Sequence, residues 1–276
     1  MAEKYSASAS PISAKDYNRQ EHKVSQFSAA QTLSESFEVS ATLVSSNFDV
    51  QSQLGQLLTI NRYSNIAGSA TLTRSFNGII TRIESLGMDS NLQYVLYQVT
   101  LKPWLELLKH THAFRVYQNQ STKDIVSDIF DNAGFKGCYK IAKMPTTKRE
   151  YCLQYNESDF DFVTRLLAEE GVHYYFTHSD KEHTLVLQDA QSPFDKADNA
   201  KFDMVETPTG SLPLLESWSP AVAFHGASVE LTAYDYSQTN VVKSKAQKST
   251  NSIANNTNLP QGPKPHLGES GDKTQP

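Results

Sequence analysis

The sequence predicts a mainly β fold with α+β insertions, and three observations carry this prediction. Short β-rich runs follow one another through residues 37–101, each bounded by turn residues. Two fourteen-residue segments, 121–134 and 158–171, carry helix-capping residues at both ends. Residues 244–276 are polar and almost lack apolar side chains, which predicts a disordered tail. Several short strands in series are typical of a closed or nearly closed antiparallel barrel.

The strand pattern is clearest in Phe37–Leu43, where apolar and polar residues alternate as in a strand with one face in water. Gly78 lies inside a later β-rich run, where a glycine permits a bulge or a barrel bend. The β-rich runs that follow the first one are residues 71–76, 78–85 and 94–101. Pro103 then stands at a plausible first helical position before Trp104.

The two capped segments predict helices of similar design. They read STKDIVSDIFDNAG and SDFDFVTRLLAEEG, with Ser first, Asp fourth, Val sixth and Gly last. The serine and the aspartate form a capping pair, and the glycine permits the positive φ that ends a helix. Two explanations of this likeness stay open: capping chemistry offers few choices, or the chain holds a weak internal repeat.

The second capped segment lies in the central stretch 151–176. Tyr151–Tyr155 alternates like a half-buried strand, and Val172–Phe176 is another β-rich run before a polar turn at Ser179–Glu182. Within the helix we expect Leu166, Leu167 or both to lie in the core.

Composition limits the function classes. The chain has 276 residues and a formal net charge of −5, with scattered basic residues, so we expect neither nucleic acid nor an acidic membrane as a partner. No run approaches the ~18 apolar residues of a membrane span. Residues 1–20 lack the apolar core of a signal peptide, so we expect synthesis in the cytoplasm and no export by the signal-peptide route.

The chain offers only weak candidates for a chemical site. His178, Glu182 and His183 faintly resemble a zinc-binding H-x-x-E-H motif, but the spacing is one residue too long and the segment is a predicted turn. Glu169 and Glu170 are neighbours on a helix, so their side chains diverge and make a poor acid–base pair. We therefore expect no catalytic, cofactor-binding or metal-binding residues and no enzyme activity.

The remaining reactive side chains also have ordinary explanations. His110 and His112 lie near a helix end and are expected at the surface. Cys138 and Cys152 form no metal-ligand spacing and are expected as reduced, small apolar side chains, with a disulfide as the alternative. The 13 Tyr and 13 Phe could stack on sugars, but packing in the core or between subunits is their commoner use.

The central stretch also resembles a known family. Its pattern Y-x-x-S-D-x-x-F-V-x-R-L-L-x-E-E-G, followed by aromatic residues, is similar to the signature of VgrG proteins, the spikes of bacterial type VI secretion systems. Shorter matches occur in the same order along the chain. The matched segments are Leu54–Ile60, Phe76–Thr81, Pro103–Leu108, Tyr155–Phe176 and Ser228–Tyr236.

This resemblance implies two small antiparallel β-barrel domains of the phage-tail-hub type. It also implies a homotrimer whose six barrels dock on a hexameric tail tube and carry effectors or adaptors outward through the type VI apparatus. The family continues into an oligonucleotide-binding fold and a β-needle that this sequence does not reach, so we expect weakened trimerisation. The alternatives are a hub or baseplate protein of a contractile phage tail and, less favoured, a carbohydrate- or cell-wall-binding β-module.

The resulting domain prediction has five parts. They are a flexible leader at 1–29, a first barrel at 30–102, an α+β region with two capped helices at 103–210, part of a second barrel at 211–243 and a disordered tail at 244–276.

Overall fold

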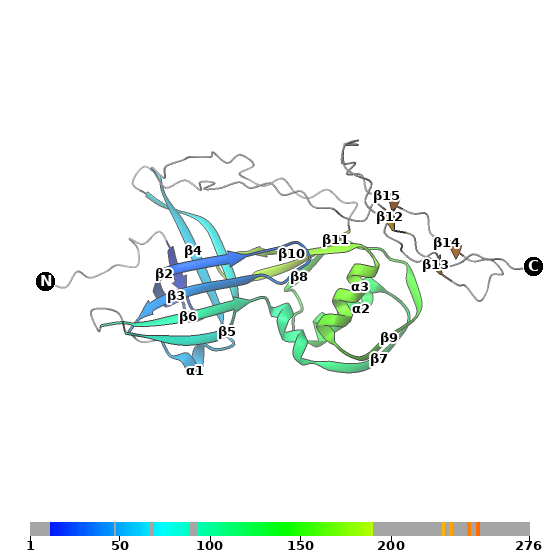
Figure 1. Cartoon of the computed structure of the whole chain (residues 1–276), viewed down its shortest axis with the longest axis horizontal. Coiled ribbons are helices and arrows are strands. Elements are labelled where there is room, and N and C mark those ends of the chain that lie inside the picture. The colour runs from blue at the N-terminus through cyan, green and yellow to red at the C-terminus, as the bar shows by residue number, and fades with distance from the viewer. Residues whose placement is uncertain are drawn as a thin grey trace, which may run out of the picture. The chain divides into compact units, whose positions relative to one another are not determined.

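The computed structural model describes most of the chain as far as Asp189 and four short strands beyond it. The described residues are 12–46, 48–66, 69–88, 93–189, 228–229, 232–233, 242–243 and 247–248. The chain divides into two units, Met1–Glu216 and Ser217–Pro276. The first unit combines a β-barrel with an α+β region (Figure 1). No helix among the described residues is long and apolar enough to cross a membrane.

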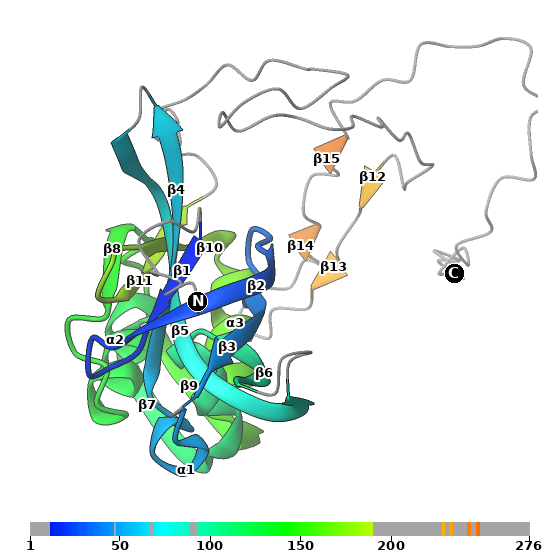
Figure 2. The same ribbon diagram turned by 90° about the vertical axis from the view of Figure 1, so that its left-hand side faces the viewer.

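Six strands form a closed antiparallel barrel in the order β1-β2-β3-β6-β5-β4. Pairing of β1 with β4 closes it, with Ile12 opposite Arg62 and Lys15 opposite Thr59. A one-turn helix, α1 (Val50–Gln53), connects β3 to β4. Figure 2 shows β4 projecting beyond the other strands of the barrel. The strands are β1 Ile12–Lys15, β2 Glu21–Ala30, β3 Glu38–Ser45, β4 Leu57–Ile66, β5 Ser69–Met88 and β6 Val95–Lys102.

The alternation in β3 fills the barrel interior as the sequence predicts. Val39, Ala41 and Leu43 are at most 1% exposed. Val39 and Ala41 pair with Leu101 and Val99 of β6, which are fully buried as well. Burial of these side chains supplies the main favourable term for closing the barrel.

The barrel begins earlier than the sequence predicts, because β1 and most of β2 fall within the expected leader 1–29. The prediction of a leader over residues 12–29 is therefore wrong. Its physical cause is that β2 turns only His22 and Val24 fully inward. A strand with so few buried side chains carries little apolar periodicity, so its sequence looks like loop.

Gly78 serves close packing rather than a bulge. Its neighbours pair regularly with β4, with Gly78 opposite Leu58. A Cβ atom at this position would lie 2.9 Å from Leu101 Cβ and 3.1 Å from the Phe37 ring. The register shifts of β5 lie elsewhere: at Thr73 in the pairing with β4, and between Ile80 and Arg82 and near Gly87 in the pairing with β6.

The α+β region places two helices against two small sheets. One sheet has the order β10-β11-β8, with β8 parallel to β11, and the other is the antiparallel pair β7–β9. Figure 1 shows both helices between these sheets, and one apolar core joins them. The elements are the 3-10 helix η2 Trp104–His110, β7 His112–Ser121, α2 Thr122–Asn132, β8 Tyr139–Lys143, β9 Lys148–Ser158, α3 Asp159–Glu169, β10 Val172–His178 and β11 His183–Asp189.

Both predicted helices are present with their predicted caps. Ser121 forms a complete capping box at α2, and Ser158 caps α3 by accepting from the backbone N–H of Asp161. Gly171 has φ of 65°, so the left-handed ending predicted for α3 is confirmed. The first helical segment differs, because Pro103 precedes a 3-10 helix rather than opening an α-helix.

In the second unit the structure describes two short antiparallel strand pairs. β12 (Ser228–Val229) pairs with β15 (Gln247–Lys248), and β13 (Thr232–Ala233) pairs with β14 (Val242–Lys243). Because β15 lies within the predicted tail 244–276, that prediction is wrong at these two residues. Most of the predicted second-barrel segment, 211–243, lies outside the described residues, so the second barrel stays a prediction.

Leu166 should be among the side chains on which the α+β core depends, because it is fully buried in α3. We expect Leu166→Ala to lower the free energy of unfolding by about 2–5 kcal/mol, through lost apolar burial and the cavity left behind. Urea unfolding followed by circular dichroism measures this. Leu86→Ala is the matched control, since Leu86 is 51% exposed, and a loss as large as that of Leu166→Ala would contradict the assignment.

Candidate functional site

The signature aspartate, Asp159, joins three elements at the start of α3. Its carboxylate accepts a hydrogen bond from Arg115 Nη1 of β7 at 2.6 Å and from Gln154 Nε2 of β9 at 2.7 Å. The Thr111 hydroxyl donates to its second oxygen at 3.0 Å. Asp159 is 3% exposed, so its carboxylate lies away from water, whereas the Arg115 side chain remains 37% exposed.

The signature residues at the other end of α3 are held by an arginine outside the signature. Arg149 of β9 lies 2.7 Å from a carboxylate oxygen of Glu169 and 2.8 Å from one of Glu170. Arg165 of α3 bonds to Glu157 at 2.6 Å and to Glu169 at 3.1 Å. Partial burial raises the pKa of Glu169, but the hydrogen bonds from the two arginines outweigh it and lower the pKa below its ordinary value. The glutamate pair is thus a structural clamp.

These contacts fix the β7–β9 sheet by its inner face and leave an outer face in water. The inner side chains include Tyr117 and Cys152, which pack in the core with the helices. The outer face consists of five large apolar side chains. They are Phe114, Val116, Tyr151, Leu153 and Tyr155. The strand Tyr151–Tyr155 is half-buried as predicted, but its two tyrosines and Leu153 form the wet side.

Two histidines lie at the junction between the barrel and the β10–β11 hairpin. His183 accepts a hydrogen bond from the Trp104 backbone N–H through Nε2 and contacts Asn77 Oδ1 through Nδ1, both at 2.9 Å. His178 accepts from the Asn77 backbone N–H at 3.1 Å. Burial lowers the pKa of His178 to about 4 and, together with the charge of His178, that of His183 to about 3. Both rings pack against Phe37.

The weak zinc motif is therefore a structural cluster. His178 and His183 do face each other across the hairpin, with ring centroids 6.3 Å apart. Their nitrogens are taken up by protein partners, and Glu182 lies in the turn, where its backbone bonds to Ser179. Within the described ranges no group of three His, Cys, Asp or Glu side chains could hold a metal ion.

The structure also shows the surroundings of the remaining histidines and cysteines that the sequence analysis considered as candidate site residues. His110 and His112 are exposed at the end of η2 and the start of β7. Cys138 and Cys152 are free thiols, so the alternative of a disulfide between them is wrong. Burial raises the pKa of both thiols, which makes them poor nucleophiles.

One arrangement that the sequence analysis missed looks like catalytic machinery. His22 lies 3.3 Å from Asp16 and 3.2 Å from the Ser45 hydroxyl. Gln53 donates to the same Asp16 carboxylate at 2.9 Å. All four residues are at most 6% exposed. A nucleophile must be reachable by its substrate, and this cluster is buried. Its contacts instead tie the turn between β1 and β2, and α1, to the end of β3.

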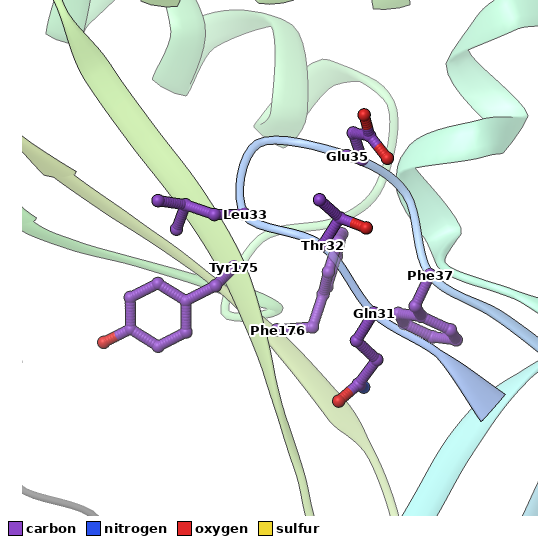
Figure 3. Close-up of a pocket in the computed structure, with 7 residues that line it drawn as sticks. All are labelled: Gln31, Thr32, Leu33, Glu35, Phe37, Tyr175 and Phe176. Carbon is purple, nitrogen blue, oxygen red and sulfur yellow. The ribbon is translucent and has the colours of Figure 1, made fainter. Parts of the chain in front are cut away.

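A small pocket of about 240 Å³ opens where the β2–β3 loop meets β10 (Figure 3). The loop is fixed there because the Ser34 backbone N–H donates to the Tyr174 carbonyl at 2.8 Å. The volume of the pocket is below the range of ~300–1,000 Å³ usual for small-molecule sites. The lining residues are Gln31, Thr32, Leu33, Glu35, Phe37, Tyr175 and Phe176.

The junction histidines predict a pH dependence of stability. Their pKa values in the folded chain lie below the ordinary 6.5, so the unfolded chain binds protons first as pH falls. The free energy of unfolding should thus decrease from about pH 6.5 down through the folded pKa values of about 4 and 3. At pH 5 we expect a loss of roughly 2 kcal/mol from His183, at about 1.4 kcal/mol per pH unit.

Urea unfolding at pH 7, 6 and 5 measures this loss above the range where carboxylates titrate. The matched variant is His183→Gln, whose amide oxygen can still accept from the Trp104 backbone N–H. Its stability should change less with pH than that of the unaltered chain, and equal slopes would refute the assignment.

The bond between Asp159 and Arg115 predicts a second effect on stability. Asp159→Ala should lower the free energy of unfolding by about 2–4 kcal/mol, because it leaves Arg115 and Gln154 without this acceptor. Since Arg115 is partly exposed, we expect a loss near the lower end of that range. The control is Glu84→Ala, which removes an exposed ion pair with Arg82 and should cost less than about 1 kcal/mol. Equal losses in the two variants, measured by thermal and urea unfolding, would contradict the role given to Asp159.

Comparison with protein families gives one match over most of the chain. A family model described as the phage tail baseplate hub (GPD) matches residues 30–271. The match extends beyond β15 and covers most of the predicted tail.

Several relatives are described as type VI secretion spike proteins. The type VI secretion system spike proteins VgrG1a and VgrG1c of Pseudomonas aeruginosa are 42% and 44% identical to this chain over 117 residues. That region is 42% of this chain but only 18% and 16% of those proteins, so the chain matches less than a fifth of their length. The actin cross-linking toxin VgrG1 of Vibrio cholerae is 34% identical over 160 residues, which are 58% of this chain and 14% of that protein.

Solved structures show the same fold. The E. coli c3393 protein, described as a type VI secretion component similar in structure to the T4 tail proteins gp27 and gp5, superposes with a TM-score of 0.55 at 26% identity. The superposition covers 66% of this chain and 50% of that one. A lidded Francisella PdpA-VgrG complex has a TM-score of 0.50 at 12% identity, over 70% of this chain and 31% of that one. The resemblance expected from the central stretch is thereby confirmed, and this chain belongs to the phage tail baseplate hub (GPD) family.

Proposed function

We propose that this chain is a hub segment of a type VI secretion spike, which docks a trimeric spike on a hexameric tail tube. The observation that carries the proposal is the joint placement of the signature residues. Asp159, Arg165, Glu169 and Glu170 all act as structural clamps between α3 and the strands rather than as reactive groups. A segment that transmits force needs such fixed elements and extended interfaces.

The chain is proposed to act without catalysing a reaction. In the described part of the chain two serine hydroxyls contact a histidine ring. Ser45 and His22 are buried at the barrel end, and Ser34 lies 3.4 Å from His173, where its hydroxyl also accepts from the Tyr174 backbone N–H. The relatives with the highest identity named above are spike proteins, which agrees with a mechanical role. Its partners would be two further copies, the tail-tube protein and the effectors or adaptors that a spike carries out of the cell.

A hub of a contractile phage tail is the second candidate, because the matching family is described by the phage baseplate. Both candidates need the same barrel and the same docking on a tube. They differ in the genes that encode the tube and the sheath, so the tube protein that binds the chain distinguishes them.

Binding to the tail tube tests the proposed function. The purified chain is mixed with tube hexamers from a type VI cluster or from a phage tail, and the complexes are weighed by size-exclusion chromatography with light scattering. We expect a complex with three chains for each hexamer, because a trimer with two barrels per chain presents six docking sites. A parallel sedimentation assay with insoluble peptidoglycan tests the cell-wall module. Binding to peptidoglycan without binding to either tube would overturn the proposal.

A further inference from the structure

The α+β region contains two units with the same order of elements. Each unit is a strand, a serine-capped helix and a second strand, first as β7-α2-β8 and then as β9-α3-β10. The capping serines are Ser121 and Ser158, so an offset of 37 positions relates the first unit to the second. Capping chemistry by itself would make only the helix ends alike, whereas a repeat would make the strands alike as well.

The backbone agrees at this offset on both sides of the helix. Asn119 and Asn156 stand two residues before the capping serines and have left-handed φ values of 52° and 50°. Residues other than glycine seldom adopt such values. After the helix, Gly134 and Gly171 have positive φ, and the N–H of each donates to the carbonyl three residues earlier at 3.1 Å. The chain therefore enters and leaves the helix in the same conformation in both units.

The buried faces of α2 and α3 also correspond. The two helices lie side by side between the sheets (Figure 1), and each has five buried residues. All five positions obey the offset of 37. The equivalent pairs are Thr122 with Asp159, Ile125 with Phe162, Val126 with Val163, Ile129 with Leu166 and Phe130 with Leu167. The two helices thus turn the same face toward the core.

The register of β7–β9 adds evidence that helix capping cannot supply. Three pairs lie near its middle: Phe114 with Tyr155, Val116 with Leu153 and Gln118 with Tyr151. The offset converts the first pair into the third. Val116 pairs with Leu153, the residue that is equivalent to Val116. This is the register that a two-fold axis between Val116 and Leu153 produces, since such an axis interchanges the two strands.

The second sheet gives the same relation independently. β8 and β10 are the equivalent strands, and β11 lies between them, parallel to β8 and antiparallel to β10. Tyr139 of β8 and its equivalent Phe176 of β10 both pair with Leu185 of β11. Moving two residues along β8 and along β10 reaches partners two residues to either side of Leu185. A two-fold axis through Leu185 therefore relates β8 to β10.

The symmetry is broken at one end of β7–β9. The register shifts between Ala113 and Phe114, so Asn156 is an extra residue on β9. Asn119 is not accompanied by such a shift. β11 stands outside the two units, because it lies between their second strands and pairs with both. These departures leave the correspondence of the helices and of the sheet centres intact.

We infer that β7-α2-β8 and β9-α3-β10 are two copies of one strand–helix–strand unit, related by a local two-fold axis, as an internal duplication produces. Strand register depends on pairing between separate segments, so it is independent of the capping residues. Both sheets and both helices agree on one offset. β11 closes the gap between the copies, and its His183 contacts Asn77 of the barrel, so this added strand also joins the repeat to the barrel.

The two asparagines before the helices test whether the units are equivalent in energy. In the full chain, Asn119→Ala and Asn156→Ala should each lower the folding equilibrium constant about tenfold, because alanine is strained at positive φ. Asn119→Gly and Asn156→Gly should leave it nearly unchanged. The control is Asn132→Ala within α2, which should cost much less although it removes a hydrogen bond to Asp128. Urea unfolding followed by circular dichroism measures these effects, and a large loss at only one of the two asparagines would contradict the inference.

An exchange of core side chains tests the two-fold relation itself. The matched variant exchanges side chains between equivalent positions of α2 and α3. Its changes are Ile125→Phe, Ile129→Leu, Phe130→Leu, Phe162→Ile, Leu166→Ile and Leu167→Phe. The displaced variant carries Ile125→Leu and Ile129→Phe in place of the first two changes and is otherwise identical. Both variants keep the composition of the unaltered chain, and all exchanged side chains belong to one apolar core.

The matched variant should be the more stable of the two, by at least about tenfold in the folding equilibrium constant, because it conserves volume at each pair of equivalent positions. Equal stability of the two variants, or a higher stability of the displaced variant, would overturn the inference. If neither variant folds, the asparagine variants decide, since they leave the core unchanged. Neither measurement involves the tail tube, so the result is independent of the proposed function.

Discussion

The buried carboxylate of Asp159 is the constraint on which the α+β region depends. It is the first residue of α3, directly after the end of β9, and its backbone N–H donates to Thr111 just before β7. Its oxygens bind Arg115 and Gln154 on adjacent strands. Asp159 therefore links the start of β7, the end of β9 and the first turn of α3. The position at the start of the helix adds to this, because the helix dipole favours a negative charge there.

That constraint separates the two faces of the β7–β9 sheet by chemistry. A two-stranded sheet is marginal by itself and needs packing on at least one side. Here the inner side supplies it through the aromatic ring of Tyr117, the thiol of Cys152 and the ion pairs at both ends. The outer side carries apolar groups that remain largely in water and interact mainly with each other across the two strands. The sheet stays folded because its inner side is packed, while exposure of the apolar outer side to water is unfavourable and favours contact with another surface.

Local chemistry accounts for what could be predicted from the sequence. The caps at Ser121 and Ser158 and the ending at Gly171 depend on residues within a few positions of each other, so a sequence pattern shows them. The strand β1 could not be found in this way, because it is only four residues long and two of its four side chains, Ser13 and Ala14, are buried without any alternation. The parallel pairing of β8 with β11 joins segments about 45 residues apart, and no short pattern encodes it.

Distance along the chain likewise limited the prediction of the site. The sequence shows that Glu169 and Glu170 stand where the dipole of α3 disfavours acids, but it does not show that Arg149 neutralises both. The alternation of Tyr151–Tyr155 predicts a half-buried strand without saying which half is buried, and the apolar half is the exposed one. The sequence of the strand alone does not show which side is buried. Cys152 and Gln154 are the inner residues because helices from other parts of the chain pack on that side.

The buried Asp16–His22–Ser45 cluster shows why geometry must be weighed together with access. Its contacts, 3.3 Å and 3.2 Å long, connect the same three residue types as a hydrolase triad. A reacting serine also needs an open approach and groups that stabilise the developing charge, and burial at the barrel end denies the first. The Gln20 backbone N–H and the Gln53 side chain also donate to Asp16, which satisfies a carboxylate that would otherwise be costly to bury. The cluster is therefore accounted for by the need to fasten α1 and the turn between β1 and β2 to the end of β3, where Ser45 lies.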